Sequence, residues 1–175
     1  MTDAPAFRYE PIALSSESTV VAEFVADASA GVAYQSEAEL ERSFIGLLQA
    51  QAYEYLTITD EAQLVANLRR QLELLNGITF SDGEWERFFT ERIAGANDGI
   101  VEKTVRVQED HVQLLKRDDG TTKNVALIDK ANVHNNRLQV INQYEVEGAF
   151  KNRYDVTVLV NGLPMVHIEL KRRGV

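Results

Sequence analysis

Hydrophobic residues recur at helical spacing in three segments of the first half of the chain. Ser36 and Glu39 form the Ser-x-x-Glu pattern of a capping box, which predicts a helix from Ser36 to about residue 52. Its apolar positions are Leu40, Phe44, Leu47 and Leu48. The same spacing predicts helices over residues 60–75 and 83–93, the second one around Trp85 and Phe88.

From about residue 111 the spacing changes from helical to alternating, which predicts a sheet after the helices. Strands are predicted over residues 111–115 and 124–128, with a turn at 118–120 between them, and over 138–146. The N-terminal residues 1–33 are weakly periodic, with a short strand over 19–24. Residues 99–108 fit neither pattern clearly, so no element is assigned there.

The clearest feature is a hairpin of residues 153–160 and 164–171 around Asn161-Gly162, a strong turn signal. Its even positions are mostly apolar: Val156, Val158, Val160, Val166, Ile168 and Leu170. Because side chains alternate with period two, both apolar sets must share one face. A plain two-residue turn would pair Val160 with Leu163 and break this match, so we predict a three-residue loop or a bulge.

The polar positions of this hairpin bring two carboxylates together. A loop over 161–163 puts Asp155 opposite Glu169, and a loop over 160–162 displaces the contact by one diagonal step. In both cases the carboxylates share a face at about 5–8 Å, with Lys171 one pleat beyond. Opposed like charges need neutralisation, which Mg²⁺ provides while it also binds waters and phosphate oxygens. With Lys171 orienting a water, the pattern indicates metal-assisted phosphodiester hydrolysis.

Two simpler interpretations stay open. Asp155, Glu169 and Lys171 also fit the solvated side of an edge hairpin in which the lysine offsets the acids. Glu41 falls within the apolar arc of the first helix, where a carboxylate needs a partner such as a metal-bound water, an Arg or a Lys. Alternatively, Glu41 lies at the rim of that arc and reaches solvent.

Composition restricts the class of protein. A chain of 175 residues with 45% hydrophobic residues fits one soluble globular domain. The absence of cysteine excludes disulfides and thiolate metal sites, and with no secretory leader or apolar span we expect a cytoplasmic, non-membrane protein. The net charge of -9 argues against a domain that binds nucleic acid unaided. Trp85 and Phe88 are expected in the core, and His167 as a hydrogen-bonded structural residue.

Residues 152–156 and 166–174 resemble the catalytic core of the PD-(D/E)xK nuclease superfamily, and more closely the N-terminal nuclease region of the type I restriction enzyme R subunit. Residues 36–41 and 53–55 resemble the opening helix of that region, so that the resemblance covers roughly 34–175. It implies a restriction-endonuclease-like α/β core, a mixed β-sheet flanked by helices with an N-terminal helical portion. It also implies site roles: Asp155 and Glu169 bind Mg²⁺, Leu170 adds its carbonyl, Lys171 serves the attacking water and Glu41 completes the acidic cluster.

The resemblance further implies a larger assembly. Residues 1–175 would be a single nuclease domain, the C-terminally truncated N-terminal fragment of an ATP-dependent DNA translocase that joins methyltransferase and specificity subunits. The chain has no Gly-x-x-x-x-Gly-Lys-Ser/Thr loop, so ATP would bind elsewhere in the parent protein. The Gln-x-x-x-Tyr motif that the family usually carries on a helix after the Glu-x-Lys strand is expected beyond the end of this chain. Tyr154 replaces the superfamily's Pro. Double-stranded DNA would meet a local basic patch of Arg153, Lys171, Arg172 and Arg173, unless these are only a solvated strand end.

Two other function classes remain. The domain could be a non-catalytic docking module whose acidic face binds a partner protein, in which case losing Glu41 or Lys171 is harmless. It could also be an unrelated metal-dependent phosphodiesterase acting on RNA or nucleotides, because the site residues alone do not distinguish these substrates from DNA.

Overall fold

The computed structural model describes residues 9–14, 20–24, 36–95, 98–146 and 152–171, with the backbone alone for 9–14, 20–24, 145–146 and 152–153. The chain divides into two compact units, residues 1–35 and 36–175. The first unit contains β1 (Tyr9–Leu14) and β2 (Val20–Phe24), which pair antiparallel. The predicted strand over 19–24 is confirmed, whereas β1 was not predicted. A single nuclease domain over 1–175 remains a prediction.

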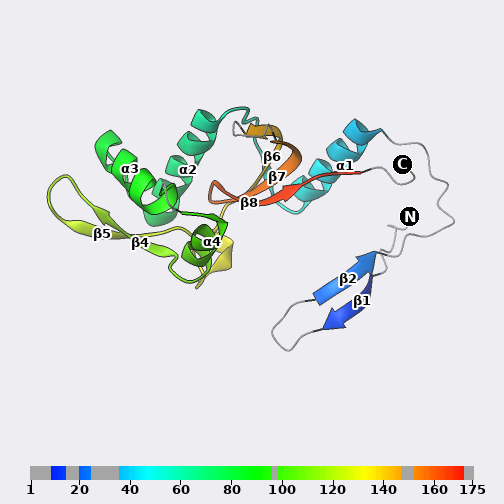
Figure 1. The fold of residues 1–175 in the computed structure, drawn as a ribbon, viewed down its shortest axis with the longest axis horizontal. Helices are drawn as coiled ribbons and strands as arrows, with labels where there is room; N and C mark the ends of the chain where they lie inside the picture. The colour runs from blue at the N-terminus through cyan, green and yellow to red at the C-terminus, as the bar shows by residue number, and fades with distance from the viewer. Residues whose placement is uncertain (1–8, 15–19, 25–35, 96–97, 147–151, 172–175) are drawn as a thin grey trace. The chain divides into compact units, whose positions relative to one another are not determined.

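Four α-helices lie in the described part of the second unit (Figure 1). They are α1 (Glu37–Ala50), α2 (Glu61–Asn76), α3 (Asp82–Phe88), which continues into a π-helical turn η1 (Phe89–Ile93), and α4 (Ile100–Gln108). The capping box of Ser36 and Glu39 is present at the start of α1. All three predicted helices are confirmed, and the segment left unassigned is α4.

The strands of the second unit form two sheets. A mixed four-stranded sheet has the order β3-β6-β7-β8, with β3 parallel to β6 and the other neighbours antiparallel. Its strands are β3 (Glu54–Tyr55), β6 (Leu138–Val146), β7 (Asn152–Val160) and β8 (Leu163–Ile168). The strands β4 (Val112–Lys116) and β5 (Thr122–Ala126) form a separate antiparallel pair. The mixed α/β class expected from the sequence is therefore confirmed.

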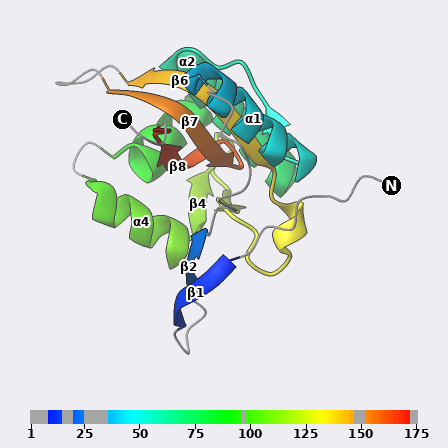
Figure 2. The ribbon, with the colours of Figure 1, turned by 90° about the vertical axis from the view of Figure 1, so that its right-hand side faces the viewer.

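Both sides of the four-stranded sheet are covered by apolar side chains. Ile45 of α1 packs with Val140 and Val156 on one side, and Figure 2 shows α1 beside β6 and β7. Ile141 and Leu159 belong to a second cluster. Because Val156 and Leu159 are both fully buried, β7 is an interior strand covered on both faces, whereas its hairpin partner β8 forms an edge of the sheet.

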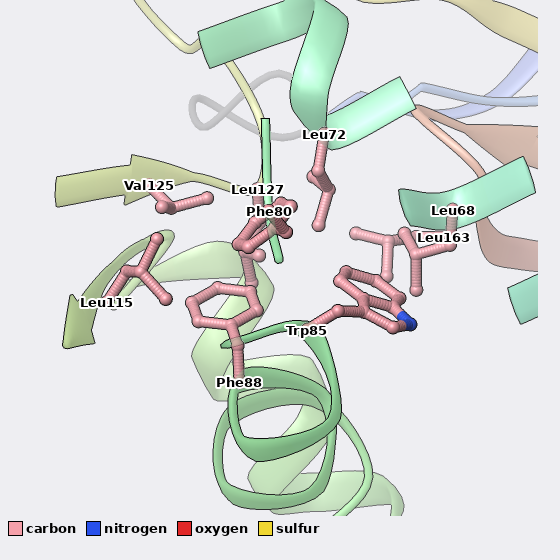
Figure 3. Packing of buried hydrophobic residues seen from close by; sticks show 9 residues of the cluster. All are labelled: Leu68, Leu72, Phe80, Trp85, Phe88, Leu115, Val125, Leu127 and Leu163. Atoms are coloured by element: carbon pink, nitrogen blue, oxygen red, sulfur yellow. The ribbon is translucent and has the colours of Figure 1, made fainter. Parts of the chain in front are cut away.

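A third cluster joins α2 and α3 to the β4–β5 pair (Figure 3). Trp85 belongs to this cluster and makes ring contacts with Phe80, Phe88 and Phe89. Each large apolar side chain buried in this way contributes roughly 1.5–3 kcal/mol to the free energy of unfolding. The aromatic residues of the predicted third helix therefore form core, as expected.

The β7–β8 hairpin combines a tight turn with a bulge. Val160 pairs with Leu163 across Asn161 and Gly162, whose φ angles of 51° and 81° suit a two-residue hairpin turn. Leu159 then pairs with Pro164 but Val158 with Val166, so Met165 is an extra residue that restores matching parity. The predicted bulge is confirmed and the two three-residue loops are wrong. The strand predicted to reach residue 171 is also wrong, because β8 ends at Ile168.

The turn of this hairpin is fixed against the rest of the unit. The Asn161 side chain is buried, donates to the carbonyl of Leu127 at 3.0 Å and accepts from the amide of Arg137 at 2.8 Å. Gly162 lies against the backbone of Leu68 on α2, so close that an added Cβ would lie 2.6 Å from the Leu68 Cα. The hairpin that carries the candidate site therefore has one end held by two independent contacts.

Candidate active site

Asp155 lies near the start of β7 and is tied to the segment that follows β8. Its Oδ2 accepts a hydrogen bond of 2.7 Å from the backbone N–H of Leu170. The Val156–Ile168 pair fixes the register at this end, and the next step of that register faces Asp155 toward Glu169. The half-buried Asp155 carboxylate thus holds the residues after β8 next to β7.

Glu169 and Lys171 lie beyond the end of β8, where they form an ion pair of 2.5 Å between Oε1 and Nζ. The side chains are 65% and 74% exposed. An ion pair this exposed adds only about 0–1 kcal/mol to the free energy of unfolding, so it can open readily. These two residues alone would fit the solvated hairpin edge, but Asp155 on an interior strand does not.

The acidic groups that act on Lys171 come from several elements of the fold. Its hydrogen bond and charge attraction to Glu169 raise the pKa of Lys171 above its ordinary value, and the charges of Asp155 and Glu37 add to the rise. Glu37 stands in the first turn of α1, so three elements contribute negative charge around one ammonium group. The structure therefore brings together Asp155, Glu169 and Lys171, with the N-terminal turn of α1 nearby.

Glu41, the fourth predicted residue, is 9% exposed on the face of α1 that packs on the sheet. Its Oε1 accepts from Nδ2 of Asn142 at 2.6 Å, and its Oε2 accepts from Nε2 of Gln143. The core-facing position is confirmed and the rim position is wrong. The donors described are amides of β6, whereas the sequence suggested a metal-bound water, an Arg or a Lys.

The amides of β6 and the α1 acid Glu37 were missed by sequence reasoning. Two neighbouring amide residues, Asn142 and Gln143, interrupt the apolar run of β6, and this was the one available signal. Neither side chain could be assigned to Glu41, because the contacts span more than 100 residues.

The remaining site predictions have different outcomes. The backbone N–H of Leu170 binds Asp155, while the predicted use of its carbonyl as a metal ligand stays a prediction. Arg153 lies in β7, but its side chain is outside the described part, as are Arg172 and Arg173. His167 is structural, as expected: its Nδ1 lies 3.0 Å from the Thr157 hydroxyl, its ring stacks on Tyr154 at 4.0 Å, and burial lowers its pKa.

The chemistry of the donor set fits a hard divalent cation. Within the described ranges no group of three or more Asp, Glu, His or Cys side chains is arranged to hold a metal ion. Magnesium does not require such a group, because it commonly takes one or two carboxylates and completes its shell with waters and phosphate oxygens. Asp155 and Glu169 supply two carboxylates from one end of the hairpin, and the exposed Lys171 can swing away from Glu169 to admit the ion.

The comparison with known proteins decides the family. Residues 34–175 match the type I restriction enzyme R protein N terminus family. The chain belongs to this family. The match spans α1 to the end of the chain, and so includes every residue assigned above to the candidate site.

This chain is homologous to several type I restriction endonuclease subunits. The EcoprrI endonuclease subunit of Escherichia coli is 44% identical over 167 residues, which are 95% of this chain and 53% of that protein. The SsaAORF53P subunit of Staphylococcus saprophyticus is 42% identical over 147 residues, 81% of this chain and 15% of that protein. The SauMSSORF170P subunit of Staphylococcus aureus is 39% identical over 149 residues. The chain thus spans about half the length of the Escherichia coli relative and about a sixth of the length of the staphylococcal ones.

Two features of this R-protein N-terminal chain limit what is assigned to it. It carries no ATP-binding loop, so ATP binding and helicase activity are not assigned to these residues. None of the described helices is long and apolar enough to cross a lipid bilayer.

Proposed function

We propose that this chain is the nuclease domain of a type I restriction enzyme and that it cleaves phosphodiester bonds of double-stranded DNA with Mg²⁺. The observation that carries the proposal is the convergence of Asp155, Glu169 and Lys171 at one end of the β7–β8 hairpin. Membership of a family of restriction subunits supports DNA as the substrate over RNA or nucleotides. We further propose that the mixed α/β structure contains a restriction-endonuclease-like core.

Each residue has a separate role in the proposed reaction. Asp155 and Glu169 would hold Mg²⁺, with the backbone carbonyl of Leu170 as a further ligand. When bound, the ion would supply charge stabilisation for the phosphate and a water of lowered pKa. Lys171 exchanges its contact with Glu169 for the attacking water or a phosphate oxygen, and it keeps its proton at neutral pH because the ordinary pKa of a lysine lies far above 7.

The buried end of the site supports these roles. Asp155 keeps one carboxylate oxygen on the Leu170 amide, which fixes the segment that carries Glu169 and Lys171. Glu41 adds a buried carboxylate on the opposing helix. A site held by an interior strand and a packed helix is positioned more precisely than one on a free loop.

The wider assembly is part of the same proposal. The protein would act in the cytoplasm with methyltransferase and specificity subunits and with an ATP-driven motor outside these residues. Because those parts would bind most of the duplex, the net charge of -9 is compatible with DNA cleavage here. Arg153, Arg172 and Arg173 are the proposed local contacts with phosphates.

The proposal is tested in the assembled complex with supercoiled plasmid, Mg²⁺ and ATP. We expect Asp155→Ala, Glu169→Ala and Lys171→Ala each to abolish cleavage while ATP hydrolysis in the same tubes continues. Glu109→Gln, which changes an exposed carboxylate after α4, serves as the matched control and should cleave normally. Cleavage that survives all three alanine changes would overturn the assignment.

A second candidate function, a docking module, is favoured by the surface of α4. Ile100 and Val101 are 81% and 65% exposed, which is unusual for two adjacent large apolar side chains. If docking is the function, Ile100→Ser with Val101→Ser will prevent assembly with the other subunits, while Asp155→Ala will leave every activity of the complex unchanged.

A further inference from the structure

A pair of amides on β6 binds the buried carboxylate of Glu41. Asn142 donates to one carboxylate oxygen and Gln143 to the other, so both oxygens are held at once. The donors are neutral, and they use two of about four acceptor positions that an ionised carboxylate offers. The amides therefore fix the orientation of the group and leave it capacity to bind a cation or the water of a cation.

The orientation of one amide is itself fixed by a third residue. The hydroxyl of Tyr55 on β3 donates to Oδ1 of Asn142 at 2.8 Å. Since that oxygen is the acceptor, the NH₂ group of Asn142 must point to Glu41, where it donates at 2.6 Å. A chain of hydrogen bonds thus runs from β3 through β6 to α1.

The backbone at Gln143 is adapted to this arrangement. Gln143 has a φ of 54° inside a strand, a left-handed conformation that non-glycine residues rarely adopt. Strain of this kind costs about 1–3 kcal/mol and persists where the surrounding structure enforces it. Alternation would normally direct consecutive strand residues to opposite faces, yet Asn142 and Gln143 reach the same carboxylate.

This distortion lies next to the candidate site. Gln143 lies on β6 between the Asn142–Val156 and Tyr144–Tyr154 pairs, and Asp155 lies between the same two pairs on β7. The carboxylate of Glu41 is therefore anchored to β6 at the step where Asp155 lies on the neighbouring strand β7.

We propose that Asn142 and Gln143 are positioning residues that hold the Glu41 carboxylate in place beside Asp155, with Tyr55 setting the amide of Asn142. The inference rests on the proposed nuclease function. Removing a residue that hydrogen-bonds to a metal ligand typically weakens metal binding about 10- to 100-fold. We expect a loss of this size when the amides of Asn142 and Gln143 are removed.

The first measurement is the affinity of the full chain for Mn²⁺, a probe for magnesium sites, by isothermal titration calorimetry. We expect Asn142→Ala and Gln143→Gly to weaken Mn²⁺ binding about 10- to 100-fold. Glycine is used at 143 because it accepts the left-handed φ and removes only the side chain. Tyr55→Phe removes a single hydroxyl from a 39% exposed side chain and should give a smaller loss in the same direction.

Gln139→Ala is the matched control. Gln139 is also a buried amide of β6, but it donates to Glu54 and Asn67 rather than to Glu41. A merely structural role predicts that the 139 and 142 variants lose stability but bind Mn²⁺ equally, and only the proposed role predicts a difference in Mn²⁺ affinity. Urea unfolding of every variant accompanies the titration.

The outcomes separate this inference from the proposed function. If Asp155→Ala weakens Mn²⁺ binding while Asn142→Ala, Gln143→Gly and Tyr55→Phe all bind as the unchanged chain does, the positioning role is wrong and the nuclease site stands. If Asp155→Ala also has no effect on Mn²⁺ binding or on cleavage in the assembled complex, the function itself is overturned. A graded loss in the three β6 and β3 variants, absent in Gln139→Ala, supports the inference.

Discussion

Replacement of Gly162 by alanine tests how tightly the turn of the catalytic hairpin is packed on α2. A Cβ added at Gly162 would lie 2.6 Å from the Cα and 3.0 Å from the N of Leu68, and both are backbone atoms that cannot rotate away. The φ of 81° adds a conformational penalty of roughly 1–2 kcal/mol for any L-residue with a side chain. Forcing extra volume into a packed contact costs about 1–3 kcal/mol more.

The free energy of unfolding should therefore fall by about 2–5 kcal/mol in Gly162→Ala, the sum of these two costs. Gly120→Ala is the matched control, because Gly120 has a φ of 83° and no atom within 4 Å of its added Cβ. It should lose only the conformational cost, about 1–2 kcal/mol. Urea unfolding of both variants measures the difference, and equal losses would refute a close contact between the turn and α2.

Three other changes test separate parts of the structure. Asn161→Gly keeps the left-handed backbone but removes the side-chain partner of the Arg137 amide and of the buried Leu127 carbonyl, so urea unfolding should show a loss of about 1–3 kcal/mol. Burial lowers the pKa of His167 below its ordinary value of 6.5. The neutral imidazole therefore contributes its full stability above pH 6.5, and this stability is lost as the pH falls toward the folded-state pKa. In His167→Gln the urea midpoint should no longer fall with pH in this range. Glu41→Ala should destabilise by about 1–3 kcal/mol because it orphans two amide donors, whereas Glu41→Gln should retain most of the packing.

Local signals in the sequence were sufficient for α1, α2 and α3 and for the bulge of the hairpin. The capping box of Ser36 and Glu39 fixed the start of α1, and the parity of apolar residues predicted the bulge that places Met165 out of register. These features depend on neighbours within a few residues, which a single sequence displays. β3, with only Glu54–Tyr55, is too short for any periodic pattern to reveal.

The rest of the site depends on contacts distant in sequence. Periodicity placed Glu41 on the buried face of α1, but the donors Asn142 and Gln143 reach it only because α1 packs on β6 and because Gln143 adopts a positive φ. No spacing rule signals that backbone conformation. The end of β8 at Ile168 was missed for a similar reason, since the Leu170 amide binds the side chain of Asp155.

The most direct test of the nuclease centre is plasmid cleavage by the assembled complex carrying Asp155→Asn. The amide oxygen of asparagine can still accept the Leu170 N–H, so the fold should survive while the negative charge is lost. The account predicts an unchanged urea unfolding curve, continued ATP hydrolysis and no detectable DNA cleavage. Cleavage at the rate of the unchanged protein, with the variant folded and ATP turned over, would contradict it.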